Sequence, residues 1–90
     1  MRKTAVDIKT EIWNNIIAEL QNNGWDTIFK YEGFDVGIDY DAITLKNNKN
    51  QIIEFTWDNW SEGDITSEED ILKELENKFD IKFQIKEIKE

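Results

Sequence analysis

The side chains most capable of chemistry in this 90-residue sequence are carboxylates, and they gather in its middle. Residues 31–70 hold eleven of the twenty acidic residues but only two basic ones, Lys46 and Lys49. Acidic and basic residues balance on either side, so the formal charge of −9 belongs to this segment. Because a field of one sign steers association, it favours basic partners or cations. The eleven residues are Glu32, Asp35, Asp39, Asp41, Glu54, Asp58, Glu62, Asp64, Glu68, Glu69 and Asp70.

Catalysis by these carboxylates finds little support in the rest of the sequence. A pair such as Asp39 and Asp58 has the chemistry for glycosidase-type acid–base work, but a chain this short leaves few residues to form the substrate cleft. No histidine is present to activate Ser61 or Ser67, and no cysteine to supply a thiolate or a sulfur-ligated zinc site. No glycine-rich phosphate loop occurs, and the charge opposes phosphate contacts. We therefore expect no enzymatic activity, no cofactor and no direct nucleic-acid binding.

Two segments show the spacing of three to four residues between apolar positions that is typical of an amphipathic helix. This spacing predicts helices near residues 5–22 and 67–79. Gly24 follows the first helix as a stop signal. Thr66 and Glu69 have the spacing of a capping box, in which Thr66 caps the second helix.

Elsewhere apolar and polar residues alternate, which predicts strands. The predicted strands are residues 25–32, 34–45, 52–57 and 81–86. In the second of them the apolar parity flips, so we place a bulge near Tyr40–Ile43. Asn47–Asn50 forms a hairpin loop that pairs Ile52–Trp57 with Ala42–Lys46.

The element order α-β-β-β-α-β predicts one α+β domain over residues 1–90. The most economical packing is a two-layer sandwich, in which both helices cover one face of a mainly antiparallel four-stranded sheet. The other face of the sheet is then open, and we expect the acidic side of the second strand to point there.

Three aspartates, Asp35, Asp39 and Asp41, share one face of that predicted strand. The hairpin returns the chain so that Asp58 ends near Asp41. Aspartate is disfavoured in strands and like charges repel, so such a row costs local stability, and a cost of this kind favours a functional role. The other interpretation is a solvated outer face that keeps the protein soluble and its edges unpaired.

The segment Asp58–Glu69 is expected to hold a loop, Trp60–Asp64, and the start of the second helix. Its register resembles an EF-hand calcium loop, with Asp first, Glu fifth, Gly sixth, Ile eighth, Thr ninth and Glu twelfth. Trp60 stands at the third position, where a side-chain oxygen is needed, and a strand instead of a helix precedes the loop. The alternative is that Gly63 makes a turn and Thr66 caps the helix.

Trp60 is the tryptophan that we expect to be exposed, since it lies among polar and acidic residues, whereas Trp57 follows the parity of the core. An aromatic ring beside carboxylates suits an interface rich in arginine. The predicted partner-binding residues are Asp35, Asp39, Asp41, Asp58, Trp60, Glu62 and Asp64; no metal ligands are assigned.

In size, charge and lack of catalytic residues, the chain is similar to small acidic inhibitors, namely immunity proteins of bacterial toxin systems and phage-encoded nucleic-acid mimics. The resemblance covers no defined motif. It implies a non-enzymatic protein that occludes a basic surface of a partner protein, such as a nuclease-type effector. The alternative is a calcium-binding or purely structural domain that uses Asp58–Glu69. No apolar run suits a membrane span or signal peptide, so we expect a cytoplasmic protein without a membrane partner.

Overall fold

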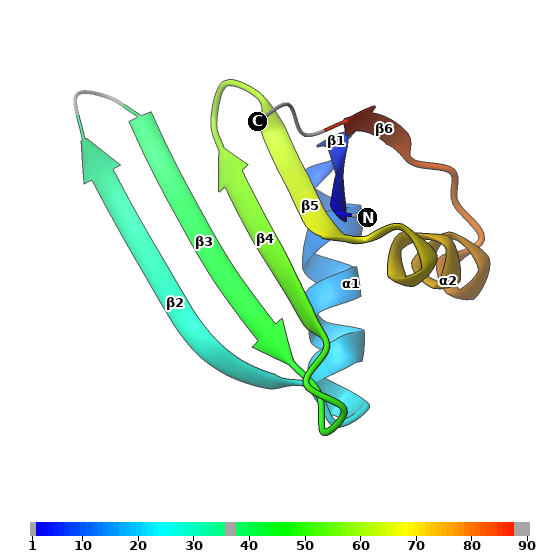
Figure 1. Ribbon diagram of the computed structural model, residues 1–90. Coiled ribbons are helices and arrows are strands. Elements are labelled where there is room, and N and C mark those ends of the chain that lie inside the picture. The colour runs from blue at the N-terminus through cyan, green and yellow to red at the C-terminus, as the bar shows by residue number, and fades with distance from the viewer. Residues whose placement is uncertain (1, 36–37, 88–90) are drawn as a thin grey trace.

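The computed structural model describes residues 2–35 and 38–87 as one antiparallel sheet and two helices (Figure 1). The strand order in the sheet is β2-β3-β4-β5-β1-β6. None of the described helices is long and apolar enough to cross a membrane. The elements are β1 (Arg2–Ile8), α1 (Thr10–Asn22), β2 (Asp26–Asp35), β3 (Ile38–Lys46), β4 (Ile52–Asp58), β5 (Glu62–Glu68), α2 (Glu69–Phe79) and β6 (Gln84–Glu87).

Both helices contribute to one apolar core on the same face of the sheet, which confirms the predicted α+β class. In Figure 1, α1 runs behind the sheet near β4 and β5, and α2 lies beside the end of β5. Trp13 of α1 packs edge-on against Phe55 of β4, with ring centroids 6.2 Å apart. The core residues are Ala5, Ile8, Trp13, Ile16, Ile17, Leu20, Leu45, Ile53, Phe55, Ile65, Ile71, Leu72, Leu75 and Phe83.

The prediction of a helix from residue 5 is wrong at its start. Residues 2–8 form β1, which lies between β5 and β6, and α1 begins only at Thr10. Ala5 and Ile8 have helical spacing, yet both are buried on one face of a strand. The register against β5 shifts between them, because three steps along β1 match two along β5. This bulge adds a residue, and Asp7 there has a φ of 57°.

The segment Asp58–Glu69 is not a loop. A turn over residues 59–61 joins β4 to β5, and β5 buries Gly63, Ile65 and Ser67 on alternate positions. The buried Ser67 hydroxyl donates a hydrogen bond to the Ile52 carbonyl oxygen at 2.8 Å, so its polar group is satisfied. With β1 and β5 added, the sheet has six strands instead of the predicted four.

The predicted capping box is also absent, because Thr66 lies inside β5. Its hydroxyl is 2.9 Å from the hydroxyl of Thr4 on β1. The helix α2 begins at Glu69 after Glu68, which makes no side-chain capping bond. The Glu69 carboxylate instead meets Lys3 Nζ at 3.0 Å, and this contact with Lys3 is the main reason that the pKa of Glu69 is lowered.

The strand predicted at residues 34–45 covers the end of one strand and most of the next. β2 ends at Asp35 and β3 begins at Ile38 and runs antiparallel to it; the predicted strand residues 36 and 37 lie outside the described residues. The predicted bulge at Tyr40–Ile43 is wrong, because β3 pairs there in continuous register with β2 and β4. The apolar residues move from even to odd positions because Ile43 and Leu45 face the helices, whereas Tyr40 is an apolar residue on the opposite, open face of the same strand.

The predicted hairpin between the third and fourth strands is confirmed. Lys46 pairs with Ile52 and the register continues along β3 and β4. The loop is closed by Asn47, whose Oδ1 accepts the backbone N–H groups of Lys49 and Gln51, each at 3.0 Å. An asparagine that bonds the backbone in this way favours a turn.

The closest packing in this core lies at Gly63, and it generates the first prediction. A Cβ at Gly63 would lie 2.5 Å from a ring carbon of Trp13, which is buried. We expect Gly63→Ala to destabilise the protein by about 1–3 kcal/mol, because the indole must shift within a packed core. Urea unfolding followed by tryptophan fluorescence measures this loss.

Gly33→Ala in β2 is the matched control. The atoms nearest to a Cβ there belong to the side chain of Tyr31, which is half exposed and can shift toward solvent more easily than a buried ring. Gly33→Ala should lower the free energy of unfolding clearly less than Gly63→Ala does. Equal losses in the two variants would contradict the role given to the contact between Trp13 and Gly63.

Candidate partner-binding face

The turn between β4 and β5 is built by Asp58. One carboxylate oxygen of Asp58, Oδ1, accepts the backbone N–H of Trp60 at 2.8 Å and of Ser61 at 2.6 Å. Such bonds from an aspartate to the backbone two and three residues on stabilise a tight turn. The turn leaves the Trp60 side chain 77% exposed, which agrees with the prediction that this tryptophan lies at the surface.

Three of the predicted acidic residues lie on the sheet face that no described helix covers. Asp58 and Glu62 are directly opposite each other in the β4–β5 ladder, and Asp64 is two residues further along β5. Side chains two residues apart on a strand point to the same face, and directly opposite residues lie about 4.5–5.5 Å apart at Cβ. The hairpin therefore brings Asp58, Glu62 and Asp64 together.

A fourth carboxylate, Asp7, joins this group from the bulge in β1. Burial raises the pKa of Asp64 above its ordinary value, and the charges of Asp58 and Asp7 raise it further. The backbone N–H of Asp7, which donates to the Asp64 carboxylate, and the charge of Lys86 act in the opposite direction. The sequence pattern did not indicate Asp7, because only the bulge turns its backbone toward Asp64. We call Asp7, Asp58, Glu62 and Asp64 the acidic cluster.

Aromatic rings border the acidic cluster on the same face. Tyr40 of β3 is directly opposite Asp58, so the two side chains share the open face. The ring of Tyr40 is 6.0 Å from that of Tyr31 on β2, and both tyrosines are substantially exposed. Phe29, two residues before Tyr31, is also exposed. The sequence places Tyr40 near the acidic loop, but the alternation of apolar residues did not indicate that Phe29 and Tyr31 are exposed on the same face.

The remaining predicted site residues do not join the acidic cluster. Asp41 pairs with Trp57, whose indole N–H donates to Thr10 at the start of α1, so Asp41 lies on the helix-bearing face. Asp39, two residues earlier on β3, shares that face with Asp41. Asp35 belongs to a different strand, β2. The prediction that Asp35, Asp39 and Asp41 share the open face of one strand is therefore wrong, and Asp58 lies on the other face from Asp41.

The calcium-loop geometry is likewise not formed. The residues that match the EF-hand register from position five to position eleven form β5 instead of a loop around a central point. Across residues 2–35 and 38–87, no group of three or more acidic side chains is arranged to hold a metal ion.

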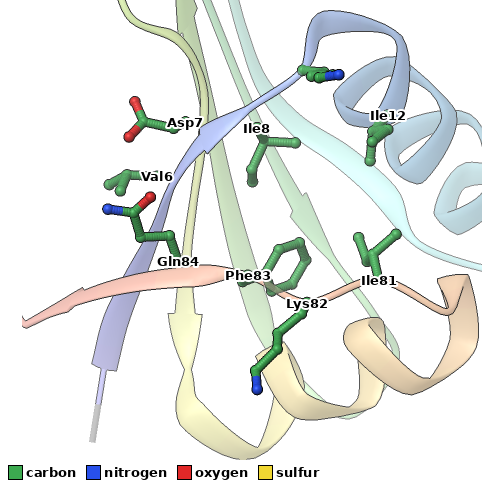
Figure 2. Close-up of a pocket in the computed structure, with 9 residues that line it drawn as sticks. Val6, Asp7, Ile8, Ile12, Ile81, Lys82, Phe83 and Gln84 are labelled. Carbon is green, nitrogen blue, oxygen red and sulfur yellow. The ribbon is translucent and has the colours of Figure 1, made fainter.

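A pocket of about 260 Å³ lies between β1, the start of α1 and the segment that enters β6 (Figure 2). Ile8, Ile12, Ile81 and Phe83 lie together on one side of β1 in this view, whereas the Asp7 carboxylate points to the other side. The apolar side chains continue the core. We therefore assign the pocket to packing and leave Asp7 in the acidic cluster.

The raised pKa of Asp64 gives a pH-dependent prediction. A folded state that holds this proton more tightly than the unfolded chain is destabilised at higher pH and recovers stability as pH falls through the raised pKa. Asp64→Asn should therefore stabilise the protein at pH 7, since it removes a partly buried charge and the repulsion from Asp58 and Asp7 and keeps an acceptor for the Asp7 N–H. Because solvent screens this position, the gain should be only roughly 0.2–1 kcal/mol. Chemical unfolding between pH 7 and pH 4 measures this difference.

The advantage of Asp64→Asn should shrink as pH falls, because protonation relieves the wild-type protein of the same repulsion. Glu74→Gln, at an exposed position of α2, removes one charge away from the acidic cluster and serves as the control. A stability difference that stays constant over the pH range would contradict the crowding at Asp64.

No protein-family model, curated protein or solved structure matches this chain. A functional assignment therefore depends on the chemistry of the open face. That face combines the acidic cluster with a border of tyrosine rings, and the turn fixed by Asp58 exposes Trp60 next to it in the chain.

Proposed function

We propose that the protein is a non-enzymatic binding protein that occludes a basic surface of a partner protein. The observation that carries the proposal is the acidic cluster beside Tyr40 on the open face of the sheet, at the turn that exposes Trp60. A nuclease-type effector, whose active site is basic because it binds phosphates, is the partner class that this chemistry suits. This is the mode of action of immunity proteins and of nucleic-acid mimics.

The charge of the acidic cluster is available to a partner. Within residues 2–35 and 38–87, none of its four carboxylates forms an ion pair with a lysine or arginine. Elsewhere on the open face, the charge of Glu54 is balanced by an ion pair with Arg2. The net negative potential of this face is therefore highest at the β4–β5 turn, which favours fast, charge-steered association.

The aromatic rings add apolar contact surface, which the carboxylates alone do not provide. Exposed Trp60 and Tyr40 offer flat apolar surfaces next to carboxylates, and a guanidinium group stacks on such rings while it pairs with an acid. Tryptophan and tyrosine are enriched among the residues that dominate interface energies. The face is therefore suited to arginine side chains, which are common in phosphate-binding sites.

The split of the predicted acidic residues between two faces provides a matched experiment. Glu62→Lys with Asp64→Lys reverses two charges in the acidic cluster, whereas Asp39→Lys with Asp41→Lys makes the same change on the helix-bearing face. The partner is first captured from a lysate of the source organism at low salt and eluted with rising salt. Association is then measured with the purified partner.

The variant with Glu62→Lys and Asp64→Lys should associate about tenfold more slowly or worse at low salt, and its rate should depend less on salt. The variant with Asp39→Lys and Asp41→Lys should associate nearly as fast as the wild type. Trp60→Ala should mainly speed dissociation, because it removes an anchor and leaves the charge unchanged. Wild-type association rates after reversal at Glu62 and Asp64 would show that the face is only solvated.

A further inference from the structure

The two edges of the sheet differ strongly. Within residues 2–35 and 38–87, β6 has 4 residues, whereas β2 has 10 and lies at the other end of the strand order, with β3 as its single neighbour. Figure 1 shows β2 as the outermost strand, with no described element beside its free edge. An edge strand presents unpaired backbone N–H and C=O groups, and proteins usually blunt such edges by making them short. The short β6 follows that rule and β2 does not.

The free edge of β2 also carries exposed apolar side chains. Phe29 and Tyr31 are 54% and 50% exposed, and both lie on the open face. From Phe29 to Asp35, β2 pairs with β3 without a register shift. A regular, extended backbone of this kind is suited to accept a further strand.

We propose that β2 pairs antiparallel with β2 of a second copy of this chain, with the two-fold axis at Tyr31. The two six-stranded sheets then form one continuous sheet across the dimer. The edge is separated from β4 by β3, so the acidic cluster stays exposed in the dimer.

The charges of β2 select this register. With Tyr31 opposite Tyr31 of the second copy, Lys30 is opposite Glu32 of the second copy, and the symmetry repeats the pair. Lys30 and Glu32 already meet within one chain at 3.0 Å, which shows that both side chains lie on one face. Opposite charges across a ladder stabilise the pairing.

Neighbouring registers are disfavoured. A shift of two residues places Lys30 against its own copy in one direction, and Glu32 against its own copy in the other; like charges directly opposite are destabilising. A shift of one residue sets outward-pointing backbone groups against inward-pointing ones, which breaks the antiparallel hydrogen-bond pattern. In the proposed register Phe29 lies opposite Gly33 of the second copy, an arrangement in which an aromatic ring covers a glycine.

Disulfide trapping tests the register directly, because the chain has no cysteine of its own. Residues directly opposite in an antiparallel pair have Cα atoms about 4.5–5.5 Å apart, which suits a disulfide. Tyr31→Cys should therefore give a covalent dimer under mild oxidation. Phe29→Cys is the control, because its two copies are about 14 Å apart in this register. Equal cross-linking of the two variants, or none with Tyr31→Cys, would overturn the register.

Charge exchange tests the dimer without any cysteine. Analytical ultracentrifugation over a wide concentration range should show a reversible dimer for the wild type. Lys30→Glu should weaken dimerisation about tenfold or more, since the new glutamate lies opposite Glu32 of the second copy and the two-fold symmetry creates this repulsion at two places. Lys30→Glu combined with Glu32→Lys should restore it, because the pairs are only reversed.

Lys49→Glu in the β3–β4 loop is the control for net charge, and circular dichroism checks that each variant is folded. Dimerisation that responds equally to Lys49→Glu and Lys30→Glu would overturn the proposal. So would a wild-type chain that remains monomeric at every concentration, since the edge would then be free for an extended segment of another protein.

Discussion

The contact between Trp13 and Gly63 determines how the helix layer and the acidic face are positioned relative to each other. The indole packs edge-on against Phe55, occupies the space that a Cβ at Gly63 would need and donates its N–H to the carbonyl oxygen of Asp64 at 3.2 Å. One side chain of α1 thus holds both strands of the β4–β5 hairpin. The outer side of the same hairpin carries Asp58, Glu62 and Asp64. Any side chain at position 63 would displace the indole, so the glycine is required for packing and not for a turn.

The carboxylates of the middle segment are divided between distinct roles by the sheet. Asp58 uses one oxygen to fix the turn, so its position owes as much to backbone hydrogen bonds as to a partner. Asp64 is placed by its strand in a partly buried position beside other acids, and the burial first and the charges of Asp58 and Asp7 second raise its pKa, at a cost in stability. No contact within the described chain offsets this crowding with an ion pair. A cost that no ion pair offsets favours a functional role for the acidic cluster over a merely solvated face.

The parts of the fold that could be predicted from the sequence are those in which apolar residues recur at a regular spacing. The second helix, the β3–β4 hairpin and the exposure of Trp60 all follow from unbroken apolar spacing and turn residues. The predictions are wrong where this spacing of apolar residues is interrupted. The bulge in β1 gives Ala5 and Ile8 helical spacing, and β5 buries a glycine and a serine in place of large apolar residues. The row of aspartates failed because the chain reverses between Asp35 and Ile38, which alternation alone does not reveal.

The sheet is unevenly supported by the helix layer. No described side chain of β2 belongs to the buried core, and Leu45 is the sole core residue that the described part of β3 supplies. β2 is held by its ladder with β3 and by the contact between Tyr31 and Tyr40, and a two-stranded ribbon without further packing is only marginally stable. Its long exposed edge is therefore the region where further pairing stabilises the fold most. Pairing of β2 with a second copy supplies the missing neighbour while the acidic cluster, two strands away, remains accessible.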